Sequence, residues 1–222
     1  MKLKSTGLPW SYSPKDFESL EHAKTLRATG SIASAIANAD NDSVVEMAAD
    51  RWRLSTAFTT SRTVTIRGRE HATTVEVSAM ATSPAITIDK DNFVIDGVRF
   101  VGDGTAPVTC IKITGDDVTI RNCTFDGFAT TLLVDGAARF IVEGCRFLNQ
   151  SVGAIDVDNG DYGVIVGNHI KTNGSGNEID LDSNSQKNVV TGNNASDGAI
   201  SIATSGGQLN KYAGNQPTVT TT

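Results

Sequence analysis

Three stretches of this 222-residue chain repeat one pattern: FVIDGVRF at 93–100, VTIRNCTF at 118–125 and FIVEGCRF at 140–147. Each places an apolar residue, a polar residue, a Gly or Asn and a final Phe at fixed positions. The pattern continues more loosely in VIVGNHI at 164–170, NVVTGNNA at 188–195 and KYAGNQP at 211–217. The aligned small residues therefore recur every 22 to 25 residues, at Gly97, Asn122, Gly144, Gly167, Gly192 and Gly214.

A second series of apolar segments, offset from the first, keeps the same period: AITI at 85–88, CIKI at 110–113, LLV at 132–134, AIDV at 154–157, EIDL at 178–181 and AISI at 199–202. Two such segments per period, each bounded by Gly, Asn or Asp, are typical of a solenoid whose rungs stack on one another. The residues are β-branched or aromatic, and the leucine-rich-repeat consensus is missing. The sequence therefore predicts an all-β solenoid of about six or seven rungs.

These repeats resemble the right-handed parallel β-helix of the pectate-lyase-like superfamily, which includes polysaccharide lyases, polygalacturonases and phage tailspikes. The resemblance spans residues 31–216 and implies one right-handed parallel β-helix with short helices capping its N-terminal end. We expect residues 1–30 to form an arm and a helix that anchor or cap the domain, and residues 217–222 to be a polar tail. The sequence predicts one helix between Ser13 and Gly30 and a second within 31–39.

The repeat also predicts which side chains point into the solenoid. Stacked rungs lie about 4.8 Å apart, so inward asparagines at one position of neighbouring rungs should form a ladder of amide hydrogen bonds. We expect such a ladder of Asn168, Asn193 and Asn215. Cys123 and Cys145 occupy the same position on two earlier rungs, where packed reduced thiols and a disulfide would both fit. Core residues on either side of this position are Ile95, Ile120, Val142, Ile165, Val190, Phe100, Phe125, Phe147 and Ile170.

The composition excludes several classes of function. A net charge of −6 argues against a nucleic-acid surface, because phosphate binding needs a basic face. No apolar run approaches the roughly 18 residues that span a bilayer, and the start MKLKSTGLPWSYS lacks the apolar core of a secretory signal. Three cysteines are too few for a disulfide framework. The sequence indicates no cofactor and no metal.

The second series carries the densest acidic column of the chain. AIDVDNGD and EIDLDSNS place Asp156 beside Asp180 and Asp158 beside Asp182, with Asp135 and Asp89 in line with the second pair. Stacked carboxylates repel one another unless water, a cation or a shared proton relieves them. A pair of carboxyl groups about 5 Å apart is the arrangement of a retaining glycosidase. Asp156 and Asp180 are therefore the catalytic candidates if the protein is an enzyme, and Asp158, Asp182 and Asp135 are candidates for binding a glycan or a cation.

Catalytic patterns of the superfamily do not transfer to this chain. Polygalacturonases combine an NTD segment with a DD and a GHG, whereas the one DD here, Asp116–Asp117, lies in a predicted turn. The sequence therefore favours a non-enzymatic phage virion component, such as a spike, fibre or decoration protein that contacts host surface glycans. The alternative is a polysaccharide lyase or glycoside hydrolase that acts at the acidic column.

Assembly is a further expectation. No helix follows the last rung to cover its open edge, and an uncovered sheet edge is a template for another chain. We therefore expect a homo-oligomer, with a trimer favoured, and contacts to other virion proteins through Met1–Gly30.

Overall fold

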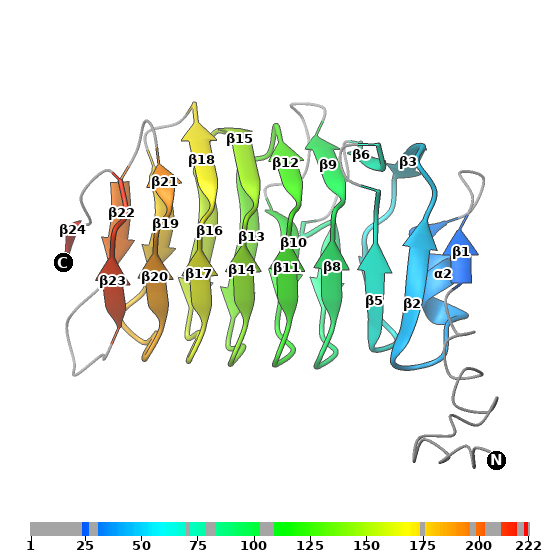
Figure 1. Ribbon diagram of the computed structural model, residues 1–222, viewed down its shortest axis with the longest axis horizontal. Helices are drawn as coiled ribbons and strands as arrows, with labels where there is room; N and C mark the ends of the chain where they lie inside the picture. The colour runs from blue at the N-terminus through cyan, green and yellow to red at the C-terminus, as the bar shows by residue number, and fades with distance from the viewer. Residues whose placement is uncertain are drawn as a thin grey trace, which may run out of the picture.

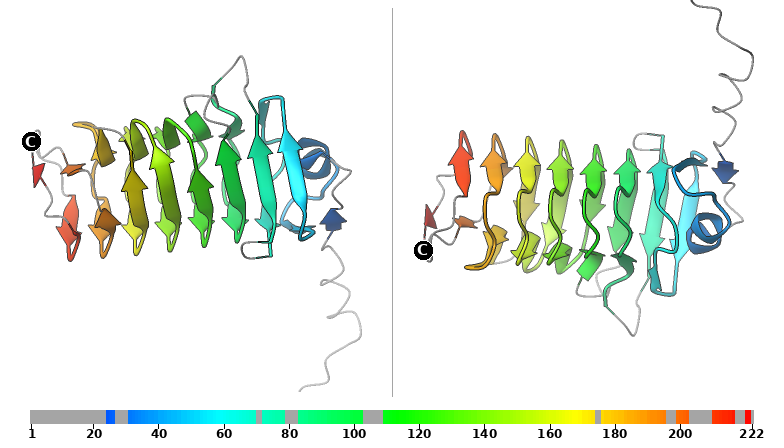
Figure 2. Two further views of the ribbon diagram at one scale, coloured as in Figure 1. Left: turned by 90° about the horizontal axis from the view of Figure 1, so that it is seen from above. Right: turned by 90° about the horizontal axis from the view of Figure 1, so that it is seen from below.

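The computed structural model is a stack of β-strand rungs in which neighbouring strands run parallel (Figure 1). Three sheets lie along the axis of the stack and enclose one apolar core (Figure 2). Parallel stacking at a period of 22 to 25 residues confirms the predicted solenoid. The structure describes residues 24–26, 31–69, 72–78, 83–102, 109–173, 176–195, 199–202, 210–216 and 220–221.

Each complete rung contributes one short strand to each sheet. Sheet A contains β1 (Lys24–Leu26), β2 (Ser43–Met47), β5 (Val64–Arg67), β8 (Val94–Asp96), β11 (Thr119–Arg121), β14 (Ile141–Glu143), β17 (Val164–Val166), β20 (Val189–Thr191) and β23 (Lys211–Ala213). Sheet B contains β3 (Arg51–Leu54), β6 (Thr74–Val77), β9 (Arg99–Gly102), β12 (Thr124–Asp126), β15 (Arg146–Gln150), β18 (His169–Thr172) and β21 (Asn194–Ala195). Sheet C contains β4 (Phe58–Thr59), β7 (Ile86–Ile88), β10 (Thr109–Ile113), β13 (Thr130–Asp135), β16 (Gly153–Asp158), β19 (Asn177–Leu181), β22 (Ala199–Ile202) and β24 (Thr220–Thr221).

The sequence predicted two strand segments per rung, and the structure has three. The first predicted segment bends at its small residue, where Gly97 has φ 69° and Asn122 has φ 53°. Glycine and asparagine tolerate this left-handed backbone, which turns the chain from sheet A into sheet B. The same position has positive φ at Gly144, Gly167, Gly192 and Gly214.

The core confirms the predicted inward residues. Phe100, Phe125 and Phe147 of sheet B stack in a column, with neighbouring ring centroids 5.2 Å apart and planes within 10° of parallel. All the predicted core residues are buried: Ile95, Ile120, Val142, Ile165, Val190, Phe100, Phe125, Phe147 and Ile170.

The predicted asparagine ladder is present at the corner between sheets A and B. Asn168 Nδ2 donates to Asn193 Oδ1 at 2.9 Å, and Asn193 Nδ2 donates to Asn215 Oδ1 at 3.0 Å. Each amide also bonds a backbone carbonyl of the preceding rung. A second amide pair, which the sequence analysis missed, joins Asn188 Nδ2 to Asn210 Oδ1 at 3.2 Å. Both sets satisfy polar groups that would cost about 1–3 kcal/mol each if buried without partners.

A short helix covers the N-terminal end of the stack (Figures 1 and 2). Helix α2 (Ile32–Ala37) begins after the N-cap Ser31, whose hydroxyl accepts a hydrogen bond from the Ser34 amide. Its buried residues are Ile32, Ala35 and Ile36, and the helix lies within the predicted range 31–39. No helix of the described residues has the length and apolarity to cross a membrane.

The helix predicted between Ser13 and Gly30 is wrong in its last part. Lys24–Leu26 forms strand β1, which pairs in parallel with β2 at Lys24 and Val45. A strand is favoured over a helix here because strand pairing covers the edge of the first rung. The rest of that helix, and the predicted anchoring role of Met1–Gly30, fall outside the described residues.

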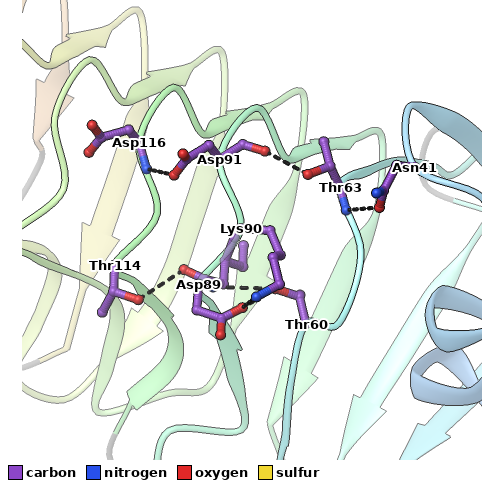
Figure 3. A network of polar contacts seen from close by, with 9 residues as sticks. Asn41, Thr60, Thr63, Asp89, Lys90, Asp91, Thr114 and Asp116 are labelled. Atoms are coloured by element: carbon purple, nitrogen blue, oxygen red, sulfur yellow. Dashed lines mark hydrogen bonds and ion pairs between the residues drawn. The ribbon is translucent and has the colours of Figure 1, made fainter.

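Polar side chains link the turns that lead from sheet C into sheet A (Figure 3). Asp91 Oδ1 accepts from the Asp116 amide at 2.9 Å, and the Asp91 carbonyl accepts from the Thr63 hydroxyl at 3.0 Å. The Thr63 amide in turn donates to Asn41 Oδ1 at 3.2 Å. At the other end of the stack, β24 pairs with β22, so part of the predicted polar tail extends the edge of sheet C.

Candidate functional site

The outer face of sheet C brings the predicted acidic residues together. Asp156 on β16 pairs with Asp180 on β19, and Asp158 on β16 pairs with Asp135 on β13. Val157 pairs with Leu181, the last residue of β19. Asp182 follows Leu181 and therefore continues the Asp135–Asp158 column. Inward-facing residues alternate with these carboxylates along each strand. Two parallel acidic columns therefore lie on this face: Asp156–Asp180 covers two neighbouring rungs, and Asp135–Asp158–Asp182 covers three.

Asp156 has the most perturbed carboxyl group of this face. Burial raises the pKa of Asp156 to about 6, and repulsion from Asp158, Asp180 and Asp182 adds to the effect. Its side chain is half-buried, with Leu133 on the preceding rung in place of a charged residue. A carboxyl group with this pKa holds a proton in weakly acidic solution, which is the property of a general acid.

In the second column, Asp135, Asp158 and Asp182, each carboxyl group has different neighbours. Lys112 Nζ contacts Asp135 Oδ2 at 2.6 Å, so the first carboxylate of this column is neutralised. Burial raises the pKa of Asp158, and repulsion from Asp182 and Asp135 raises it further. Burial alone would raise the pKa of Asp182, but hydrogen bonds from the Ser185 hydroxyl and neighbouring backbone amides hold it below its usual value. Asp182 is thus fixed as a turn-capping carboxylate.

A shallow hollow of about 70 Å³ opens beside Asp156 and Asp180. Val152, directly before β16, and Asn177, the first residue of β19, line it, and the sequence analysis missed both. Val152 is 52% exposed, which makes it one of the few large apolar side chains on the described surface. The only signal in the sequence is that both residues directly precede or begin the acidic strands. The hollow therefore places a small apolar surface next to the carboxyl pair.

The three cysteines of the described residues are in less reactive surroundings. Cys110, Cys123 and Cys145 are free and buried, and burial raises the pKa of the Cys110 and Cys145 thiols. Within the described ranges, no group of three or more His, Cys, Asp or Glu side chains could hold a metal ion.

Three solved structures share this fold. An alginate lyase from Paenibacillus sp. str. FPU-7 has a TM-score of 0.68 and 16% identity, over 87% of this chain and 75% of that chain. The catalytic domain of a GH87 alpha-1,3-glucanase in complex with nigerose has a TM-score of 0.65 and 15% identity, over 94% of this chain and 46% of that chain. A PL6 alginate lyase in complex with a trisaccharide has a TM-score of 0.54 and 14% identity, over 88% of this chain and 54% of that chain.

At these identities, the structural likeness establishes the fold, and this chain spans about half the length of the second and third proteins. No curated protein sequence matches the chain. The family described as "Right handed beta helix region" matches residues 62–216, which is more than half of the chain. These residues contain the rungs from β5 to β23. The chain therefore belongs to the right-handed β-helix family.

Proposed function

We propose that this protein is a glycoside hydrolase that cleaves a polysaccharide on the outer face of sheet C. The observation that carries the proposal is the pairing of Asp156, with its pKa raised to about 6, with Asp180 on the next rung. Asp156 would protonate the glycosidic oxygen as the bond to the anomeric carbon breaks and the Asp180 carboxylate bonds to that carbon. Water, deprotonated by Asp156, would then attack the same carbon and release the sugar from Asp180. Neighbouring rungs lie about 4.8 Å apart, close to the roughly 5–5.5 Å between the carboxyl groups of retaining enzymes.

Charge on this face favours a neutral substrate. Asp156, Asp158 and Asp180 have no cationic side chain within salt-bridge distance among the described residues, and Lys112 is already paired with Asp135. A uronate polymer would bring further carboxylates against these groups, and like charges in close contact repel. The hydrolysis of a neutral glycan therefore suits the site better than β-elimination on an acidic one.

The virion prediction stays untested. The three solved structures described above are two alginate lyases and a glucanase, so they support the carbohydrate-active alternative rather than a spike or fibre. A homo-oligomer, with a trimer favoured, also remains a proposal, as does any contact through Met1–Gly30.

The release of reducing ends from a panel of neutral and acidic polysaccharides tests the proposed activity. We expect release from a neutral glycan, and a loss of at least about 100-fold in Asp156→Asn and Asp180→Asn, because general acid and nucleophilic groups each contribute on this scale. Asp89→Asn, an acidic position of the same sheet two rungs before Asp135, is the matched control and should retain activity. An absence of release from every polymer, or equal activity in all variants, would refute the proposal.

A further inference from the structure

A row of turn residues between sheets C and A has an unfavourable backbone conformation. Each lies two residues before a sheet A strand, so the five occupy one position on successive rungs (the loops at the foot of sheet A in Figure 1). Their φ angles lie between 56° and 59°, in the left-handed region. We name this set the turn row: Asn92, Asp117, Arg139, Tyr162 and Lys187.

The residue types in the second half of the turn row need an explanation. Asparagine and aspartate tolerate a left-handed backbone, whereas arginine, tyrosine and lysine are disfavoured in it. The corner between sheets A and B has the same kind of backbone and uses only glycine or asparagine, from Gly97 to Gly214. The chain therefore keeps three long side chains where a smaller residue would be more stable. Backbone strain retained in this way is a feature of functional sites.

Contacts between the side chains of the turn row hold them in place. Arg139 donates to both carboxylate oxygens of Asp117 at 2.7 Å and to Asp116 at 3.1 Å. Lys187 Nζ donates to the Tyr162 hydroxyl and lies 4.6 Å from the centroid of its ring. Tyr162 nevertheless remains 51% exposed. Lys187 thus holds the ring at its hydroxyl and over one face, while much of the surface of Tyr162 stays in solvent.

We propose that the turn row is a glycan-binding surface, with the Tyr162 ring as the platform on which a neutral sugar stacks. The aliphatic face of a pyranose covers an aromatic ring, and a tyrosine offers this rigid surface at low entropic cost. Arg139 has N–H donors beyond its bonds to Asp116 and Asp117, and Lys187 has donors beyond its bond to Tyr162, so both can bond sugar hydroxyls.

Charge again favours a neutral ligand. Asp116 and Asp117 bind Arg139, and Asp161 precedes Tyr162 in the turn, so these carboxylates counter the two cations. The turn row also follows directly on the ends of the acidic strands, since Tyr162 is four residues after Asp158. A glycan held here would extend along the border of the proposed catalytic face. The chemical class of the glycan therefore rests on the proposed function, although the turn row itself is separate from Asp156.

Affinity electrophoresis of the whole chain in gels containing laminarin, dextran, soluble starch or alginate tests this surface. We expect a neutral polysaccharide to retard the wild-type protein, and Tyr162→Ala to weaken binding about tenfold, which is the upper range for an aromatic contact. Tyr162→Phe keeps the ring and should bind like wild type. This conservative variant is the matched control for the loss of the ring.

Tyr162→Asn separates binding from folding. Asparagine suits the left-handed backbone, so this variant should have a higher Tm than wild type and still lose binding. Unchanged binding by both Tyr162→Ala and Tyr162→Asn, retardation by alginate alone, or no retardation in any gel would overturn the proposal. If the wild type hydrolyses a glycan and Tyr162→Ala still binds that glycan normally, only the proposed binding surface fails. If the wild type binds a glycan without hydrolysing it and Tyr162→Ala loses that binding, only the proposed activity fails.

Discussion

The backbone amide of Cys145 donates a hydrogen bond to Asn168 Oδ1 at 2.9 Å, where a stack of thiols meets a ladder of amides. The Cys145 thiol points to the Ile120 carbonyl at 3.7 Å, and Asn168 Nδ2 donates to the Val142 carbonyl at 3.0 Å. Ile120 and Val142 pair on neighbouring rungs. The thiol therefore occupies the place of an amide but makes only a weak hydrogen bond in it.

Replacing Cys145 by asparagine should extend the ladder by one rung. The new amide can donate to the Ile120 carbonyl and accept from the Cys123 amide, and each added hydrogen bond contributes about 1 kcal/mol. We expect Cys145→Asn to match or exceed the wild type in urea-induced unfolding. Cys145→Leu, which removes the weak donor and adds volume, is the comparison and should lower stability. A Cys145→Asn variant less stable than Cys145→Leu would contradict this view of the ladder.

Breaking the ladder in its middle should have the opposite effect. Asn193→Leu removes the acceptor of both the Asn168 amide nitrogen and Asn168 Nδ2. The loss should be about 1–3 kcal/mol in the free energy of unfolding, because the partners stay buried. Asn194→Leu changes the next residue, which points outward and is exposed, and should leave stability within about 0.5 kcal/mol. Equal melting curves for the two variants would show that the ladder is not stabilising.

Replacing Gly163 by alanine should lower stability for a steric reason. An added Cβ would collide with the buried ring of Phe140 from the preceding rung. We expect Gly163→Ala to cost about 1–3 kcal/mol, as overpacked cores do. Phe140→Leu removes the collision, so the double variant should lose less stability than the two single changes together. Strict additivity in chemical denaturation would count against this contact.

The rung pattern explains how much of the structure the sequence could predict. Inward residues such as Ile120 and Phe125 follow from the alternation of side chains along a strand, and the corner follows from residues such as Gly97. The break of each first segment into two strands was missed, although the buried residues Ile95 and Val98 lie three positions apart across Gly97 and so interrupt the alternation. Strand β1 was missed because three residues carry no period.

The sequence could predict which carboxylates of the candidate site align on neighbouring rungs, but not their pKa values. Register follows from the repeat, so the alignment of Asp156 with Asp180 could be foreseen and is confirmed. The raised pKa of Asp156 depends mainly on burial, which comes from side chains and turns on neighbouring rungs. Val152 and Asn177 enter the hollow because of turn geometry, for which the repeat holds no signal. The catalytic roles of Asp156 and Asp180 stay predictions.

The raised pKa of Asp156 has a consequence for stability. Its folded-state pKa of about 6 exceeds the unfolded value of about 3.9, so its stabilising contribution is complete below about pH 4 and is lost as the pH rises through 6. We expect Asp156→Asn to gain Tm relative to wild type between pH 4 and 7. The pKa of Asp182 is lowered, so its effect on stability has the opposite pH dependence. Its stabilising contribution is present above about pH 4 and is lost as the pH falls. The same pH dependence for Asp156→Asn and Asp182→Asn would contradict these assignments.

The assembly prediction concerns the C-terminal end of the stack. Tyr212 of β23 continues the inward column of Val190 but is 43% exposed, since no further described strand covers it. A second copy could cover this edge, so we expect light scattering to give a homo-oligomer, with a trimer favoured. Tyr212→Lys should shift the equilibrium toward monomers. A wild-type protein that is monomeric at all concentrations would contradict the expectation.

The anomeric configuration of newly released sugar ends, followed by proton NMR during digestion of a neutral polysaccharide, tests the central claim most directly. The Asp156–Asp180 pair on neighbouring rungs predicts products that first appear with the configuration of the bond that was cut, and no such products in Asp156→Asn. Products of inverted configuration, unsaturated ends from β-elimination, or unchanged release in Asp156→Asn would contradict the account.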